Sequence, residues 1–147
     1  MCGICGELRF DGTTVMSAVL PAMLATLERR GPDNQGVYSA AIEGGAAVAL
    51  GHRRLAIIDL SSRADQPLYD AATGLVLVFN GTIYNYPQLR KELQALGHHF
   101  TSSGDSEVII KAYAAWGEQA VSRLQGMFAF AIWDIAKQQL FLARPLN

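Results

Sequence analysis

The chain has 147 residues, 50% of them hydrophobic and 17% charged, and its formal net charge at pH 7 is −1. This length suits one domain and the composition suits an ordinary globular fold, which excludes an intrinsically disordered chain. A near-neutral charge balance without a basic run argues against nucleic acid or anionic membrane partners, and no apolar run is long enough to span a bilayer.

The first half of the chain predicts a strand, a helix and two more strands. Residues 2–10 predict a strand that ends at a turn. Apolar residues at helical spacing from Leu20 onward predict a helix to about residue 29. Residues 36–42 and 46–58 then predict strands that are joined through a pair of glycines.

The middle of the chain predicts a loop followed by a buried strand. Residues 59–73 carry the Ser, Asp, Pro and Gly of a connecting loop. The apolar run at 75–79 predicts a strand at the centre of a sheet. The Asn80-Gly81 pair that follows it is typical of a type I′ hairpin turn.

Two helices and a hairpin are expected in the last third. Asn85 is a favourable N-cap for a helix that ends at Gly97, and a second helix is expected from about residue 106 to Gly117. Residues 127–133 and 139–143 predict a closing hairpin. This mixture of elements predicts an α+β fold, with helices on the outer faces of antiparallel sheets.

The two cysteines, Cys2 and Cys5, lie at the start of the chain. They are too close together to staple a fold of this size, and such sparse cysteine usage fits a reducing, cytoplasmic compartment. A zinc site would need further ligands, and His52, His98 and His99 lack the paired spacing of such a site. A thioredoxin-type pair normally lies between a strand and a helix, not inside a strand. Cys5 is therefore expected to be a small buried apolar residue.

Cys2 offers a different chemistry. Once the initiator methionine is removed, a thiol and a free α-amine belong to the same residue. Because an α-amine titrates near neutral pH, it can serve as the general base for its own thiol. This arrangement predicts acyl transfer by attack of the sulfur on a carbonyl carbon. The condition is that Met1 is absent, since an acylated nitrogen is not basic.

Short motifs occur in order along almost the whole chain. They are MCGI at 1–4, RGPD at 30–33, GHRRLAIID at 51–59, QPL at 66–68, FNG at 79–81, IYN at 83–85, GDSEV at 104–108 and LQGMFAFA at 124–131. Together they closely resemble the glutaminase domain of asparagine-synthetase-type class II glutamine amidotransferases. The resemblance implies one domain over residues 1–147 with the N-terminal-nucleophile hydrolase fold, a four-layer αββα sandwich with antiparallel sheets.

The resemblance implies catalytic roles for three residues. Cys2 is the expected nucleophile, and the Asn80 side-chain amide and the Gly81 backbone N–H are the expected donors of an oxyanion hole. Loss of one such donor typically costs about 2.7 to 4 kcal/mol of transition-state stabilisation. His52 is expected to be a hydrogen-bonded structural residue, because the N-terminal amine makes a separate base unnecessary.

The resemblance also implies how the substrate is bound. Arg54 is expected to clamp the α-carboxylate of glutamine, a task that suits its planar, bidentate guanidinium. Asp105 is expected to bind the α-ammonium group, and backbone groups around Leu55 and Ile57 are expected to line the same pocket. Thr82 stands where asparagine synthetases typically have a glutamate that helps to hold the ammonium. We therefore expect weaker glutamine binding, with Asp105 carrying most of this recognition.

The expected function is hydrolysis of glutamine to glutamate and ammonia for an ATP-dependent amide synthetase of the asparagine synthetase type. The synthetase domain is absent from this sequence, and ATP and Mg²⁺ are expected only there; no metal or organic cofactor is expected in this domain. The start CGICGE at 2–7, Thr82 and the segment Tyr84-Asn85-Tyr86 resemble the branch that amidates N-acetylglutaminylglutamine. A homodimer is left open. The alternative functions are a catalytically silent domain that docks against a synthetase, and a redox or zinc module.

Overall fold

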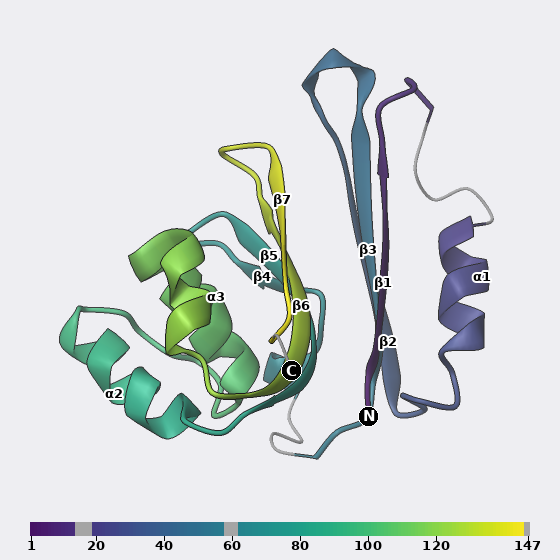
Figure 1. Cartoon of the computed structure of the whole chain (residues 1–147). Coiled ribbons are helices and arrows are strands. Elements are labelled where there is room, and N and C mark those ends of the chain that lie inside the picture. Colours follow the sequence, from purple (N-terminus) through teal and green to yellow (C-terminus); the bar gives the residue numbers. More distant parts are fainter. Residues whose placement is uncertain (14–18, 58–61, 146–147) are drawn as a thin grey trace.

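The computed structural model describes residues 1–13, 19–57 and 62–145. Its elements are, in chain order, β1 (Gly3–Arg9), α1 (Val19–Thr26), β2 (Asn34–Ala41), β3 (Ala47–Arg54), β4 (Leu68–Asp70), β5 (Leu75–Ile83), α2 (Tyr86–Ala95), α3 (Asp105–Trp116), β6 (Gly126–Asp134) and β7 (Gln139–Ala143). Figure 1 shows four layers: α1, a sheet of order β1-β3-β2, a sheet of order β4-β5-β6-β7, and the helices α2 and α3.

The first sheet is antiparallel and has β3 at its centre. Successive side chains of a strand point to opposite faces, and β3 uses both of them. Leu50 packs toward the second sheet, whereas Ala49 packs against Leu24 of α1. By the same alternation, His52 and Arg54 face the second sheet. The polar end of β3 is therefore aimed at the space between the two sheets.

The second sheet is also antiparallel, and β5 has a neighbouring strand on each side, β4 and β6. Leu77 belongs to a core cluster with Ile109 of α3, whereas Val76 and Val78 pack toward the first sheet. Asn80 shares the parity of Val78 and so faces the first sheet as well. An apolar layer thus joins the two sheets, and the polar ends of β3 and β5 meet beyond it.

These layers confirm the predicted fold class, an αββα sandwich with antiparallel sheets. The strands and helices expected from the sequence are present, with shifted bounds. Residue 58 of the third expected strand and residues 59–61 of the expected loop lie outside the described residues. Among the residues that are described, no helix combines the length and the apolarity needed to cross a membrane.

The hairpin turn predicted at Asn80-Gly81 is wrong. Strand β5 continues through both residues to Ile83, and Gly81 lies opposite Phe128 of β6. The glycine is needed for another reason: its φ is 143°, and a Cβ there would lie 2.1 Å from the carbonyl oxygen of Met127. The close approach of β6, not a chain reversal, accounts for the glycine.

Two other expectations need correction. The short strand β4 lies inside the segment expected to be a loop. Asn85 precedes α2 but its side chain makes no capping hydrogen bond. Its amide instead donates to the carbonyl oxygen of Arg123 and accepts from the backbone N–H of Gln125. This asparagine therefore fastens the start of α2 to the segment that leads into β6.

Candidate active site

A cavity of about 230 Å³ lies where the start of β1 and the ends of β3 and β5 come together. All eight site residues predicted from the sequence line it: Cys2, Arg54, Leu55, Ile57, Asn80, Gly81, Thr82 and Asp105. A cavity of this volume has room for a small-molecule ligand. Segments far apart in the sequence therefore converge on a site for a small molecule.

The Cys2 thiol rests on the backbone of Leu55. Because β1 pairs antiparallel with β3, with Gly3 opposite Arg53, the first residues of the chain lie beside the end of β3. The backbone N–H of Leu55 donates to Sγ at 3.3 Å, and the thiol donates to the Leu55 carbonyl oxygen at 3.6 Å. Arg30 Nε donates to the Cys2 carbonyl oxygen at 3.3 Å. The sulfur is thus fixed by main-chain groups at the cavity wall.

Asn80 brings a side-chain amide to the same cavity. Its Oδ1 atom is buried and has no hydrogen-bond partner among the described residues. Buried polar atoms are normally paired, so this unpaired oxygen is free to accept a hydrogen bond from a ligand in the cavity. Gly81 follows directly and also lines the cavity.

Arg54 is the last residue of β3 and is only 8% exposed. Its Nη1 forms an ion pair with Oδ1 of Asp65, which follows the short 3₁₀ segment Ser62–Ala64. A buried charge of this kind requires a charged or hydrogen-bonding partner. Held in this way, the guanidinium presents a rigid cation at the cavity wall, which suits a carboxylate ligand.

Asp105 begins α3 and is 6% exposed. Its Oδ2 accepts a hydrogen bond from the backbone N–H of Ile83 at 3.0 Å. Burial raises the pKa of the Asp105 carboxyl above its usual value, and the bond from Ile83 acts in the opposite direction. A carboxylate held in such surroundings favours a cationic partner, so the cavity lining offers one cation and one carboxylate, the charges that complement an amino acid.

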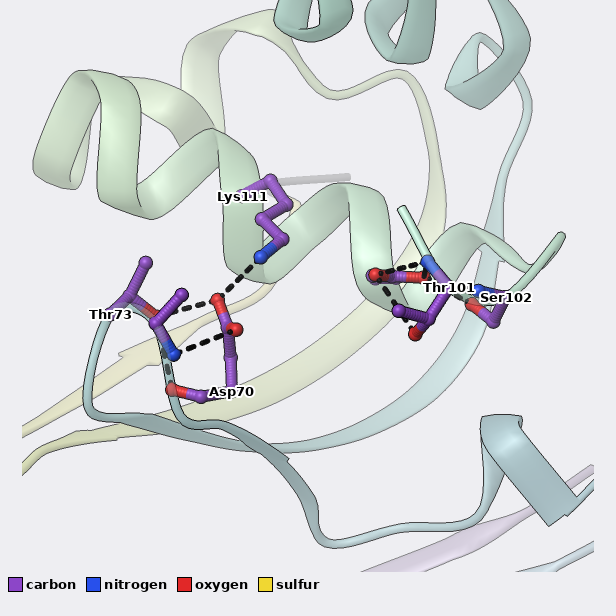
Figure 2. Close-up of polar contacts among 7 residues, drawn as sticks. Asp70, Thr73, Thr101, Ser102 and Lys111 are labelled. Atoms are coloured by element: carbon purple, nitrogen blue, oxygen red, sulfur yellow. Dashed lines mark hydrogen bonds and ion pairs between the residues drawn. The ribbon is translucent and has the colours of Figure 1, made fainter. Parts of the chain in front are cut away.

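Polar contacts further along α3 fasten this helix to its surroundings (Figure 2). The Glu107 carboxylate accepts hydrogen bonds from the backbone N–H groups of Thr101 at 2.9 Å and Ser102 at 2.7 Å. One turn later, Lys111 Nζ forms an ion pair with Asp70 Oδ2 of β4 at 2.8 Å. These contacts fix the preceding loop and the second sheet against the first turns of α3.

His52 is 1% exposed, and its Nε2 lies 3.2 Å from the carbonyl oxygen of Phe79. The expectation of a hydrogen-bonded structural histidine is confirmed. Burial lowers the pKa of His52 to about 4. The imidazole is therefore neutral at physiological pH.

Several lining residues received no role from the sequence. Gln66, Tyr84 and Met127 all line the cavity. Tyr84 and Met127 are 63% and 69% exposed and, with Ile57, make its mouth apolar. Gln66, Tyr84 and Met127 lie within the motifs QPL, IYN and LQGMFAFA, but no local pattern in the sequence indicates what their side chains contact. Within residues 1–13, 19–57 and 62–145, no three His, Cys, Asp or Glu side chains are grouped as metal ligands.

Two antiparallel sheets are packed between helical layers, and Cys2, which directly precedes β1, lines the cavity. This arrangement defines an N-terminal-nucleophile hydrolase fold. The chain belongs to the family described as glutamine amidotransferase domain, which matches residues 1–145. The fold is also that of the glutamine phosphoribosylpyrophosphate amidotransferase from B. subtilis complexed with ADP and GMP. That structure gives a TM-score of 0.65 at 24% identity, covering 82% of this chain and 33% of its own.

The sequence relatives include proteins named as glutamine-hydrolysing asparagine synthetases. Asparagine synthetase [glutamine-hydrolyzing] 3 of Bacillus subtilis (strain 168) is 40% identical over 147 residues, which is 98% of this chain and 23% of that protein. A putative asparagine synthetase of Mycobacterium tuberculosis (strain ATCC 25618 / H37Rv) is 40% identical over 156 residues, 96% of this chain and 24% of that protein. The chain thus spans about a quarter of the length of these relatives.

Proposed function

We propose that this domain hydrolyses the side-chain amide of glutamine, with Cys2 as the nucleophile once residue 2 carries a free α-amine. The observation that carries the proposal is the convergence on one cavity of the Cys2 thiol, the Asn80 amide and two opposite charges, Arg54 and Asp105. The first two groups suit attack on an amide, and the charges suit the two ends of an amino acid.

The reaction follows from these groups. The α-amine of Cys2 accepts the thiol proton, and the sulfur attacks the side-chain carbonyl carbon of glutamine. The Asn80 amide and the Gly81 N–H stabilise the tetrahedral oxyanion. The amine returns the proton to the leaving nitrogen, the C–N bond breaks, and ammonia departs from a thioester. Water then attacks the thioester with the same amine as base, which breaks the C–S bond and releases glutamate.

Substrate recognition is assigned to the charged walls. Arg54 binds the α-carboxylate through charge-assisted hydrogen bonds, and Asp105 binds the α-ammonium. Leu55 and Ile57 supply the backbone between them. Thr82 brings no charge to the ammonium end, so Asp105 provides the counter-charge there.

The ammonia released is proposed to serve an ATP- and Mg²⁺-dependent synthetase domain, because the two relatives described above are named as asparagine synthetases. The apolar mouth formed by Ile57, Tyr84 and Met127 suits contact with such a domain. In this proposal, glutamine binds in the cavity and the synthetase domain contacts the apolar residues around its mouth.

The test uses protein whose N-terminal residue has been verified as Cys2 by intact mass. We expect it to release glutamate from glutamine and to be labelled at Cys2 alone by a glutamine analogue that carries a diazoketone in place of the amide. Cys2→Ala should abolish both, while Cys5→Ala is the matched control and should retain both. Labelling at Cys5, or full activity in Cys2→Ala, would contradict the mechanism. Absence of both activity and labelling in the verified protein would favour the silent docking domain.

A further inference from the structure

The edge of the second sheet is incomplete next to the cavity. Strand β4 pairs with β5 through only three residues, and the pair nearest the cavity is Leu68 with Leu77. Continued in the same register, Gln66 would lie opposite Phe79. The backbone pairing stops at Leu68, before Gln66 is reached. Pro67, which lies between Gln66 and Leu68, has no N–H to donate.

Two side chains take the place of the missing strand at Phe79. The backbone N–H of Phe79 donates to Oε1 of Gln66 at 2.6 Å. The carbonyl oxygen of Phe79 lies 3.2 Å from Nε2 of His52. A carbonyl oxygen can only accept, so His52 donates from Nε2 and is the Nε2–H tautomer. Its Nδ1 is buried and has no partner among the described residues, which agrees with a neutral ring.

The two side chains come from the elements that carry the other half of the site. His52 is on β3, two residues before Arg54 and on the same face. Gln66 directly follows Asp65, which forms the ion pair with Arg54. Each hydrogen bond to Phe79 therefore connects β5 with the segments that place Arg54 and Leu55.

Asn80 depends on this connection because its side-chain oxygen has no anchor of its own among the described residues. Its position relative to the Cys2 sulfur is set by the backbone of β5. On the β6 side that backbone is held by strand pairing, through Phe79 with Phe130 and Asn80 with Ala129. On the opposite side it is held by His52 and Gln66.

We propose that His52 and Gln66 are positioning residues. Their hydrogen bonds to the backbone C=O and N–H of Phe79, together called the grip, fix Asn80 and Gly81 relative to Cys2. The inference rests on the proposed function, in which Asn80 and Gly81 stabilise the oxyanion. Because the oxyanion exists only in the transition state and the intermediate, the grip acts on kcat and leaves KM for glutamine nearly unchanged.

The experiment compares loss and rescue at both positions. Gln66→Leu removes the acceptor, whereas Gln66→Glu keeps one; His52→Leu removes the donor, whereas His52→Gln places an amide N–H near the position of Nε2. We expect kcat to fall about ten- to a hundredfold in each Leu variant, with KM changed less than about threefold, and to recover in large part in each conservative variant. The exposed residues Gln94 and His99, changed to Leu, are the matched controls.

A second readout does not require activity. Amide hydrogen exchange at Phe79 should accelerate at least about tenfold in Gln66→Leu and stay slow in Gln66→Glu, while exchange at Leu77 is unchanged. If the unaltered protein fails to hydrolyse glutamine, the proposed function is lost, and this exchange rate still decides whether the grip exists. An unchanged Phe79 exchange rate in Gln66→Leu, or a Leu variant that raises KM while kcat is preserved, would overturn the inference.

Discussion

Asp105 Oδ2 accepts a hydrogen bond from the backbone N–H of Ile83 at 3.0 Å, which ties the start of α3 to the end of β5. Asp105→Asn separates the two tasks of this carboxylate, since an amide oxygen still accepts from Ile83 but carries no charge. We expect the melting temperature to change little and KM for glutamine to rise about ten- to a hundredfold, the value of one charged hydrogen bond. Steady-state kinetics with thermal melting checks this, and an unchanged KM would remove Asp105 from ammonium binding.

Thr82 lines the cavity next to Gly81 and faces the first sheet, but carries no charge. A carboxylate there would add a second counter-charge for the α-ammonium of glutamine. We expect Thr82→Glu to lower KM for glutamine about tenfold. Thr82→Gln is the control, because it has the same size and no charge and should leave KM nearly unchanged. If Thr82→Gln lowers KM for glutamine as much as Thr82→Glu does, the size of the side chain and not its charge is responsible for the tighter binding.

Gly81→Ala should strain the structure at a close approach of β5 and β6. A Cβ at Gly81 would lie 2.1 Å from the Met127 carbonyl oxygen, whereas at Gly74, also at positive φ, it would meet no atom within 4 Å. Gly74→Ala therefore measures the backbone cost alone, about 1 kcal/mol. We expect Gly81→Ala to lower the free energy of unfolding by about 3 kcal/mol. If urea denaturation shows that Gly81→Ala and Gly74→Ala lose the same free energy of unfolding, then β6 shifts to make room for the added methyl group.

His52 makes stability depend on pH. Burial lowers its pKa from 6.5 to about 4, so between these values the unfolded chain binds a proton that the folded protein does not. The contribution of the neutral ring is therefore complete above about pH 6.5 and is lost as the pH falls toward 4, a change on the order of 3 kcal/mol.

The measurement is urea unfolding of the unaltered protein and of His52→Gln at several pH values between 7 and 4. We expect the free energy of unfolding to fall more steeply with acidification in the unaltered protein. Asp105, whose raised pKa acts in the opposite direction, is present in both proteins and cancels in the comparison. Parallel curves would mean that the buried ring takes up its proton without cost.

Periodicity predicted the elements that bury one face, and it failed where tertiary contacts decide. The apolar run at 75–79 and the spacing from Leu20 identified β5 and α1 because burial alone dictates them. The Asn80-Gly81 pair misled because its local preference for a turn is overridden by pairing with β6. The three residues of β4 are too few to show a pattern among loop-forming residues.

The cavity residues were identified by family resemblance, not by local pattern. Nothing in the spacing of Cys2, Arg54, Asn80 and Asp105 indicates that strands from two sheets bring them together; that follows only from the pairing of β1 with β3 and the packing of β3 on β5. The hydrogen bonds of Gln66 and His52 to Phe79 were equally hidden, because they depend on where a strand stops.

The Cys2 sulfur lies at the start of the first sheet, and the Asn80 amide lies on the second sheet. The apolar layer between these sheets includes Leu50, Val78 and Trp133. In the proposed function, the thickness of this layer sets the distance from the Cys2 sulfur to the oxyanion donors Asn80 and Gly81. Trp133 does not line the cavity, but we expect a change of its side-chain volume to alter that distance by tilting one sheet against the other. Side-chain packing in the interior of this domain therefore controls the geometry of the proposed reaction site.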